Sequence, residues 1–311
     1  MKKITLNWLN ILLFILTFIT TTFAGAIWRG VYTPPFTFTQ VMSGLEYSFS
    51  IMFIILAHEY GHYFASKYHR VDCTHPYMIP VPPFLLGINF GTMGAFIKTK
   101  SQINFRKSLF DIGAYGPLAG FVATVIILIY GYSNLPSKEY ILAIHRDYFN
   151  QNASEHGIEL VFGNNLLLYL LNNYYSQFYE FIPPMSEIYH YPYLCAGWLG
   201  LFITSMNLIP VGQLDGGHIT YAVFGQEKHY GIAKTFTFAL IFLGINGLIG
   251  GSIGSEIWLI WALILKFIIK EHHPPIMYFE NNLTNFRKLI AVIILLIFIL
   301  SFTPNAIFIR G

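Results

Sequence analysis

Charged side chains are scarce in this chain: they make up 11% of its 311 residues, whereas 55% of the residues are hydrophobic. A soluble domain carries about 25% charged residues, so the composition excludes an ordinary soluble protein and predicts an integral membrane protein. The net charge of +3 is small and scattered, and it gives no basis for binding nucleic acid. Internal repeats and low-complexity tracts are also missing.

What the chain has instead is a series of long apolar runs. In chain order they cover residues 8–28, 45–66, 109–132, 193–224, 235–250, 257–270 and 289–308. They predict an α-helical polytopic membrane protein with roughly six to seven transmembrane helices. The fourth run is interrupted at Asn207–Pro210 and at Asp215–Gly217. The first run could be a signal peptide, because Ala24–Ala26 resembles a cleavage site, but its length favours a retained span.

The segment 67–107, between the second and third runs, lacks the pattern of a span. Its first half contains four prolines: Pro76, Pro80, Pro82 and Pro83. They exclude a helix there, and Gly91–Thr99 is typical of a short strand. We expect a re-entrant β-hairpin that dips into the membrane, because non-helical backbone is tolerated at that depth only where it is buried in protein or lines a wet cavity. An ordinary surface loop is the alternative.

Lysine and arginine predict the orientation. The segment 67–107 holds six of them and the segment 133–190 holds two. The positive-inside rule therefore places 67–107 in the cytoplasm and 133–190 outside, with Cys73 and Cys195 on opposite sides and no disulfide between them. Within the outer loop, Val161–Tyr179 is typical of an amphipathic helix on the membrane surface.

The second run carries the most informative motif, which reads FIILAHEYGHYF over Phe53–Phe64. His58 and His62 are four residues apart, so on a helix they share one face and can bind one ion. HExxH is the zinc-peptidase arrangement, with two histidine ligands and the adjacent Glu59 as general base. Its apolar setting strengthens this prediction, because ionisable groups at membrane depth are costly and usually functional. A chance match is the alternative, so other residues must decide.

A catalytic zinc site needs a third protein ligand. The extended pattern HExxHxxGxxH fails, because Ala65 stands at the glycine and Tyr68 at the last histidine, and His69 comes one residue too late. A glutamate on a nearby downstream helix fails as well, because no acid occurs between Asp72 and Asp111.

The remaining candidate is Asp215, since a carboxylate within a span needs a partner. We expect the adjacent Gly216–Gly217 to loosen the helix and let it pack close to the HEYGH helix. A role for Asp215 in capping a helix after the Pro210 break is the alternative.

Together, HExxH in one span and N-x-x-P-x-x-x-L-D-G-G in a later one resemble the paired signature of the site-2 protease family of intramembrane zinc proteases. Further segments match the family in order: HPYMIPVPP, FGTMGAFI, GAYGPLAGF and AGWLGLFITSMNLIPVGQLDGGH. The likeness covers most of the chain from about residue 50 to 230 and is greatest to bacterial and plastid-type members. The chain departs from many members in lacking an inserted PDZ domain and room for a CBS domain, which puts regulation by such domains in doubt.

The resemblance implies a zinc metalloendopeptidase in which residues 1–311 form a single membrane-embedded protease domain. His58, His62 and Asp215 would bind Zn²⁺, and Glu59 would be the general base. Its substrates would be transmembrane helices, cleaved by regulated intramembrane proteolysis in a multi-pass protein of the cell membrane. A bacterial plasma membrane is favoured, with the active site towards the cytoplasmic side.

Substrate contacts are expected in two places. The resemblance assigns Asn207 to the substrate carbonyl or the oxyanion, with a hydrogen bond between spans as the alternative. Because a helical peptide bond is hidden, the substrate must unwind locally, and a strand containing Gly94, Ala95 and Phe96 could hold the unwound stretch by edge pairing. His218 receives no role.

Two other classes of protein are the alternatives to a site-2 protease. Prenyl-protein peptidases also carry HExxH in a membrane, but the LDGG motif and the missing downstream glutamate argue against them. A metal transporter should show several polar spans, whereas the ionisable groups here gather in two segments. A catalytically inactive scaffold would be expected to lose Glu59, which is present.

Overall fold

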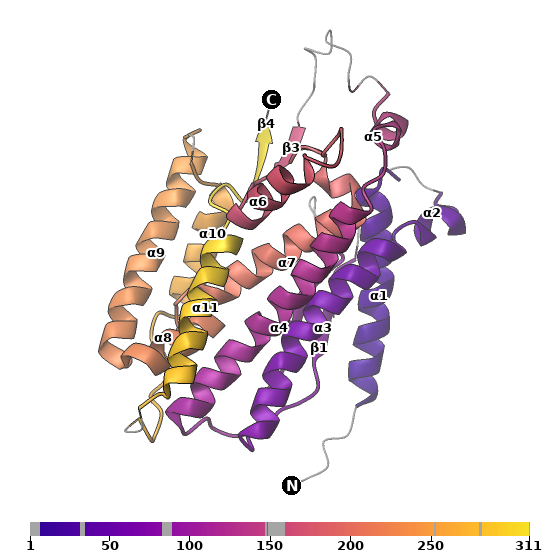
Figure 1. Ribbon diagram of the computed structural model, residues 1–311. Helices are drawn as coiled ribbons and strands as arrows, with labels where there is room; N and C mark the ends of the chain where they lie inside the picture. Colours follow the sequence, from indigo (N-terminus) through magenta and orange to yellow (C-terminus); the bar gives the residue numbers. More distant parts are fainter. Residues whose placement is uncertain are drawn as a thin grey trace.

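The computed structural model describes residues 7–31, 35–82, 89–146, 148, 159–251, 253–279 and 282–310. Its long helices pack into an elongated bundle, with the chain termini towards opposite ends (Figure 1). The helices in chain order are α1 (Trp8–Trp28), α2 (Phe38–Met42), α3 (Leu45–Tyr68), α4 (Arg106–Ser133), α5 (Glu139–Ile144), α6 (Leu166–Tyr175), η1 (Ile188–His190), α7 (Pro192–Leu208), α8 (Asp215–Phe224), α9 (Gln226–Leu248), α10 (Glu256–Ile264), η2 (Leu265–Ile269) and α11 (Asn285–Ser301).

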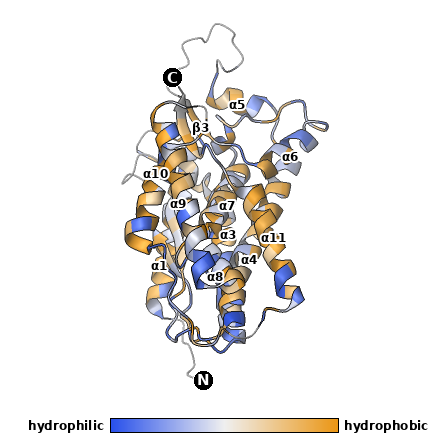
Figure 2. Cartoon of the chain, turned by 90° about the vertical axis from the view of Figure 1, so that its left-hand side faces the viewer, coloured by the Kyte–Doolittle hydropathy of each residue, from blue (hydrophilic) through white to orange (hydrophobic). Residues whose placement is uncertain are grey.

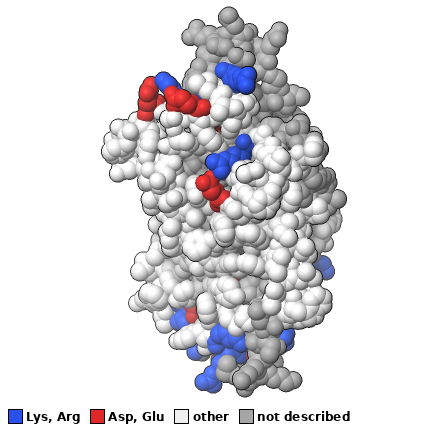
Figure 3. Space-filling view, turned by 90° about the vertical axis from the view of Figure 1, so that its right-hand side faces the viewer, with Lys and Arg blue, Asp and Glu red and all other residues white. Residues whose placement is uncertain are grey.

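Four helical segments of the described residues are long and apolar enough to cross a membrane: α1, α2 with α3, α4 and α9. Hydrophobic residues cover the sides of the outer helices α10 and α11 (Figure 2). On the face drawn in Figure 3, charged side chains gather towards the two ends and leave an uncharged band between them. The protein is therefore a helical, multi-pass membrane protein.

The fourth apolar run forms two helices rather than one. α7 ends at Leu208, and α8 begins at Asp215 after a turn. Pro210 lies in this turn, where its missing N–H and fixed ring prevent a continuous helix. α7 is the most deeply buried helix: its Trp198 is fully buried, and the indole Nε1–H donates to the Gly163 carbonyl at 2.7 Å. This buried helix leads the chain directly to Asp215.

A β-hairpin lies between α3 and α4 in the sequence. β1 (Tyr77–Pro80) pairs antiparallel with β2 (Thr92–Phe96), with Met78 opposite Ala95. The connecting residues 83–88, which include Pro83, lie outside the described residues. α1 holds the hairpin in place, because Asn10 donates to the Pro76 carbonyl at 2.8 Å and Thr20 to the Gly91 carbonyl at 2.6 Å.

Several predicted bounds differ from those in the structure. The surface helix expected at 161–179 covers only Leu166–Tyr175, where Asn165 caps its first turn, and residues 149–158 of this loop lie outside the described residues. The last run, expected to span 289–308, ends as a helix at Ser301 because Pro304 cannot continue it. A strand before α6 and a strand after α11 form a second sheet, in which β3 (Glu159–Phe162) pairs antiparallel with β4 (Ile307–Arg310).

Candidate metal centre

Three side chains from two helices converge on one point inside the bundle. His58 and His62 lie on α3, and Asp215 is the first residue of α8. The two Nε2 atoms are 3.0 Å apart, and Asp215 Oδ2 lies 3.3 Å from His58 Nε2 and 3.4 Å from His62 Nε2. A tetrahedral Zn²⁺ with bonds of about 2.1 Å holds its ligand atoms roughly 3.4 Å apart. The three atoms therefore fit a single ion, and we call them the buried triad.

The backbone of α4 sets the orientation of one imidazole. His62 Nδ1 lies 2.6 Å from the carbonyl oxygen of Ile112. A carbonyl oxygen can only accept, so Nδ1 carries the proton and donates it. Nε2 of His62 is then left with its lone pair facing His58 and Asp215, which is the state that a metal ligand needs.

Glu59 lies beside the triad on α3, and only 7% of it is exposed. Its carboxyl group interacts electrostatically with all three triad side chains and hydrogen-bonds to the backbone of Ile97, just after β2. The acid expected to act as general base is thus close to the triad and to the end of the hairpin strand. This arrangement suits a group that takes up and returns a proton in a confined site.

Glycines of α4 let the two histidines approach. A Cβ at Gly116 would collide with the His62 imidazole, and a Cβ at Gly120 would lie 3.0 Å from the Cβ of His58. The prediction that Gly216–Gly217 would allow close packing against the HEYGH helix was wrong. Those two glycines pack against the backbone of Leu208 to Gly212, so they tighten the turn before α8 instead.

Asn207 and His218 flank Asp215 in sequence, but they lie on different helices. Asn207 is half-buried in the last turn of α7, so the helix break separates it from Asp215. His218 lies on α8, and its Nδ1 is 2.7 Å from Nε2 of His273. Nδ1 of His273 donates to the Pro274 carbonyl at 2.6 Å, and burial lowers the pKa of His273. His273 therefore accepts from His218, a link that no sequence signal pointed to.

The residues expected to hold substrate lie on an accessible strand. Gly94, Ala95 and Phe96 belong to β2, and Phe96 is 49% exposed. Among the described residues β2 pairs with β1 alone, so its other edge has no neighbouring strand. Gly94 has φ +91°, which favours glycine, and a Cβ there would meet nothing within 4 Å.

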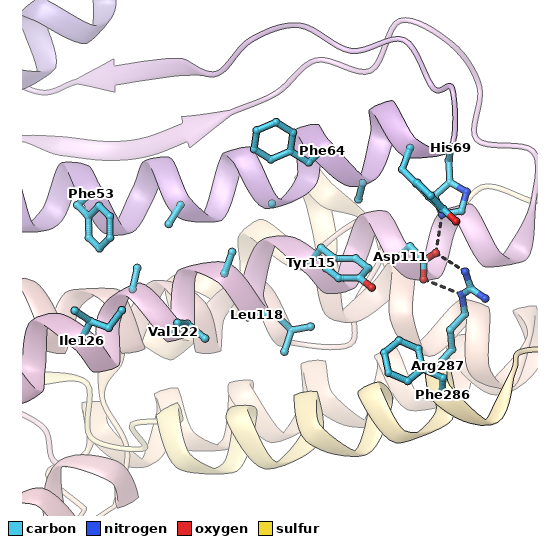
Figure 4. A pocket seen from close by; sticks show the side chains of 16 residues that line it. Phe53, Phe64, His69, Asp111, Tyr115, Leu118, Val122, Ile126, Phe286 and Arg287 are labelled. Carbon is cyan, nitrogen blue, oxygen red and sulfur yellow. Dashed lines mark hydrogen bonds and ion pairs between the residues drawn. The ribbon is translucent and has the colours of Figure 1, made fainter.

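A groove of about 880 Å³ runs along α3 and α4 (Figure 4), and none of the triad residues lines it. Its walls are mainly apolar, and one end is closed by His69, Asp111 and Arg287. Asp111 accepts two bonds from Arg287, at 2.8 and 2.6 Å, and one of 2.6 Å from His69. Asp111 on α4 therefore joins the end of α3, through His69, to α11, through Arg287. The sequence had excluded His69 as a zinc ligand but had not identified its partners.

The comparisons with known proteins agree on one family. Residues 46–245 match the model of peptidase family M50. The chain is 27% identical over 267 residues to the probable zinc metalloprotease EGY1, chloroplastic, of Oryza sativa subsp. japonica, an alignment that covers 85% of this chain and 41% of the relative. The protein of the same name from Arabidopsis thaliana is also 27% identical, with 85% and 43% covered.

A third relative is the probable zinc metalloprotease EGY2, chloroplastic, of Oryza sativa subsp. indica, which is 26% identical over 72% of this chain and 36% of its own length. The chain thus spans about two fifths of the length of the curated relatives it matches. No solved structure is significantly similar to it.

Proposed function

This chain belongs to peptidase family M50, the site-2 protease family, and we propose that it is a zinc metalloendopeptidase that hydrolyses peptide bonds within or near the transmembrane segments of membrane proteins. The observation that carries this proposal is the buried triad with Glu59 beside it, inside a bundle of membrane-crossing helices. The names of the relatives, which describe zinc metalloproteases, support the choice of Zn²⁺.

His58, His62 and Asp215 would hold the ion. Zn²⁺, when bound, supplies Lewis-acid polarisation of the scissile carbonyl and of water. Glu59 takes the proton released by the attacking water and passes it to the leaving amine, for which its position beside the triad is suited. The Asn207 amide donates to the substrate carbonyl oxygen as negative charge develops there.

The substrate is a transmembrane helix that unwinds locally and pairs with the open edge of β2. Two observations support this: the edge has no neighbouring strand among the described residues, and the chain just beyond β2 reaches the Glu59 carboxyl group. Gly94, Ala95 and Phe96 would then contact the substrate backbone. Edge pairing presents an extended peptide, whose carbonyls are accessible, in place of a helix whose peptide bonds are hidden.

The topology that goes with this function has six to seven spans. α7 and α11 have 17 residues each, near the lower limit of about 17–25 for a span, and they would add to the four longer segments. The hairpin of 67–107 would be re-entrant from the cytoplasm, and 133–190 would be extracytoplasmic, in agreement with the distribution of lysine and arginine. The membrane would be a bacterial plasma membrane, and the active site would lie towards its cytoplasmic side.

Zinc content and cleavage, measured together in wild type and Glu59→Gln, test the proposal. Detergent-solubilised protein is offered a panel of single-span substrates. We expect both proteins to retain the ion at the buried triad and only wild type to cleave, with a loss in the variant of about 10²–10⁴-fold. Equal cleavage by both proteins would exclude Glu59 as the base. Zinc that is equally absent from wild type and from His58→Ala/His62→Ala would refute the metal site and leave a non-enzymatic scaffold.

A further inference from the structure

A second group of metal-ligating side chains lies far from the buried triad. His145 follows α5, Glu187 precedes η1, and His190 ends it. These elements belong to the segment 133–190 and lie with the end of α1 and the start of α3, as the Arg29–Glu46 ion pair and the Arg29–Tyr140 hydrogen bond indicate. His58 is twelve residues further along α3 than Glu46, which is about 18 Å on a helix.

The three ligand atoms have the spacing of a zinc site. The Nε2 atoms of His145 and His190 are 3.0 Å apart. Glu187 Oε2 lies 3.5 Å from the first and 3.6 Å from the second. These separations bracket the roughly 3.4 Å expected around a tetrahedral Zn²⁺. We propose that His145, Glu187 and His190 form a second Zn²⁺ site, which fastens the segment 133–190 to the C-terminal end of α1 and the start of α7. We call them the outer triad.

The protonation state of His190 supports metal binding. Its Nδ1 lies 2.6 Å from the Trp28 carbonyl oxygen, so Nδ1 donates and Nε2 presents its lone pair to the other two side chains. A neutral imidazole is the form that binds a metal ion.

The outer triad has both a rigid side and an open side. The His190 side chain is fully buried, and its carbonyl accepts a 2.6 Å hydrogen bond from Tyr140. Glu187 is 9% exposed, whereas His145 is 41% exposed. An ion can therefore enter past His145, and water can complete its coordination. Because α7 begins two residues after His190, an ion here would fix the start of the helix that leads to Asp215.

Metal content of the full-length protein in detergent tests this site independently of the proposed function. Each variant is stripped with a chelator, reloaded with Zn²⁺, dialysed and analysed by mass spectrometry of the metal. We expect two ions per chain in wild type, one in His145→Ala, one in His58→Ala/His62→Ala and none in the combined variant. His272→Ala, which removes an exposed histidine stacked on Tyr230, is the matched control and should keep both.

Cobalt binding provides a second measurement that does not depend on counting metal ions per chain. In the His58→Ala/His62→Ala background, Co²⁺ should give the visible absorption of a four- or five-coordinate site, and adding His145→Gln should weaken Co²⁺ binding by at least about 100-fold. Equal metal content in wild type and His145→Ala, or cobalt spectra unaffected by His145→Gln, would overturn the outer triad and leave a simple hydrogen bond between the two rings. A loss of metal with His145→Ala but not with His58→Ala/His62→Ala would support the outer triad and refute the proposed catalytic site.

Discussion

The buried and outer triads have nearly the same local geometry and very different surroundings. In each, two Nε2 atoms are 3.0 Å apart and a carboxylate oxygen lies 3.3–3.6 Å from both. In each, one histidine donates from Nδ1 to a backbone carbonyl at 2.6 Å. The buried triad, however, lies where the long helices α3 and α4 meet the start of α8, beside Glu59, whereas the outer triad is built from short elements and has one half-exposed ligand.

Under the two proposals, ligand spacing alone does not define the chemistry of a metal centre. Donor atoms at the same distances can hold the same ion for different purposes. What separates the two triads is the acid next to the ion, the exclusion of water and the means of bringing a peptide near. Glu59, the burial of the two histidines and the open edge of β2 are suited to these requirements at the buried triad. The outer triad instead joins short elements of the segment 133–190 next to the end of α1, which suits a structural ion.

Replacing each carboxylate by its amide should separate the two roles most strongly. Asp215→Asn should remove one ion and lower cleavage by at least about 100-fold, because a neutral amide is a poorer zinc ligand than a carboxylate. Glu187→Gln should also remove one ion but should lower cleavage far less, because that ion is structural. Metal analysis and a cleavage assay on the same preparations measure both effects. Equal losses of cleavage would mean that the triads do not differ in function.

A methyl group added to α4 should disturb the buried triad alone. In Gly116→Ala the new Cβ collides with the His62 ring, so we expect zinc affinity there to fall about tenfold or more and cleavage to fall with it. The outer triad should keep its affinity, as measured by competition with a chelating dye.

Gly231→Ala is the matched control for this change. It adds the same methyl group to a membrane-crossing helix, α9, where nothing lies within 4 Å. Alanine in place of a helical glycine stabilises by roughly 0.5–1 kcal/mol, so this variant should bind zinc normally and melt no earlier than wild type. A defect of the same size in both variants would show that the close approach of Gly116 to His62 is not what matters.

The smallest effect is expected from the Tyr140 hydrogen bond that holds His190 of the outer triad in place. Tyr140→Phe removes the hydroxyl that donates to the His190 carbonyl, a bond of about 1 kcal/mol, so zinc affinity at the outer triad should fall roughly fivefold. Tyr179→Phe removes a comparable hydroxyl, which donates to the Ser133 carbonyl in the same segment, and should leave this affinity unchanged. Dye competition in the His58→Ala/His62→Ala background isolates the site. An equal change in both variants would argue that Tyr140 does not position His190.

Local patterns in the sequence predicted much of the fold and the buried triad. The first three apolar runs became α1, α3 and α4, because a bilayer-length run of apolar residues has few alternatives to a helix. His58 and His62 could be paired from their spacing, since a helix brings residues four apart onto one face. Asp215 stood out because an acid is rare within an apolar run. The end of α11 was missed, although Pro304 was a visible signal.

Contacts between distant segments could not be predicted in the same way. β3 pairs with β4 across nearly 150 residues of sequence, and no property of either strand names the other. His69 looked like a zinc ligand one position out of register, and only the packing of α11 against α4 reveals Asp111 and Arg287 as its partners.

The sequence by itself determined the helices, the membrane setting and the residues of the buried triad, because each depends on neighbours along one chain segment or on a motif with a set order. The tertiary structure decided that Gly116 rather than Gly216 makes room for His62, and that His145 meets Glu187 and His190. These two contacts depend on how separate elements pack against one another, and that packing involves the whole helical bundle. The outer triad matches no motif in the sequence, and only the folded chain brings His145 within reach of Glu187 and His190.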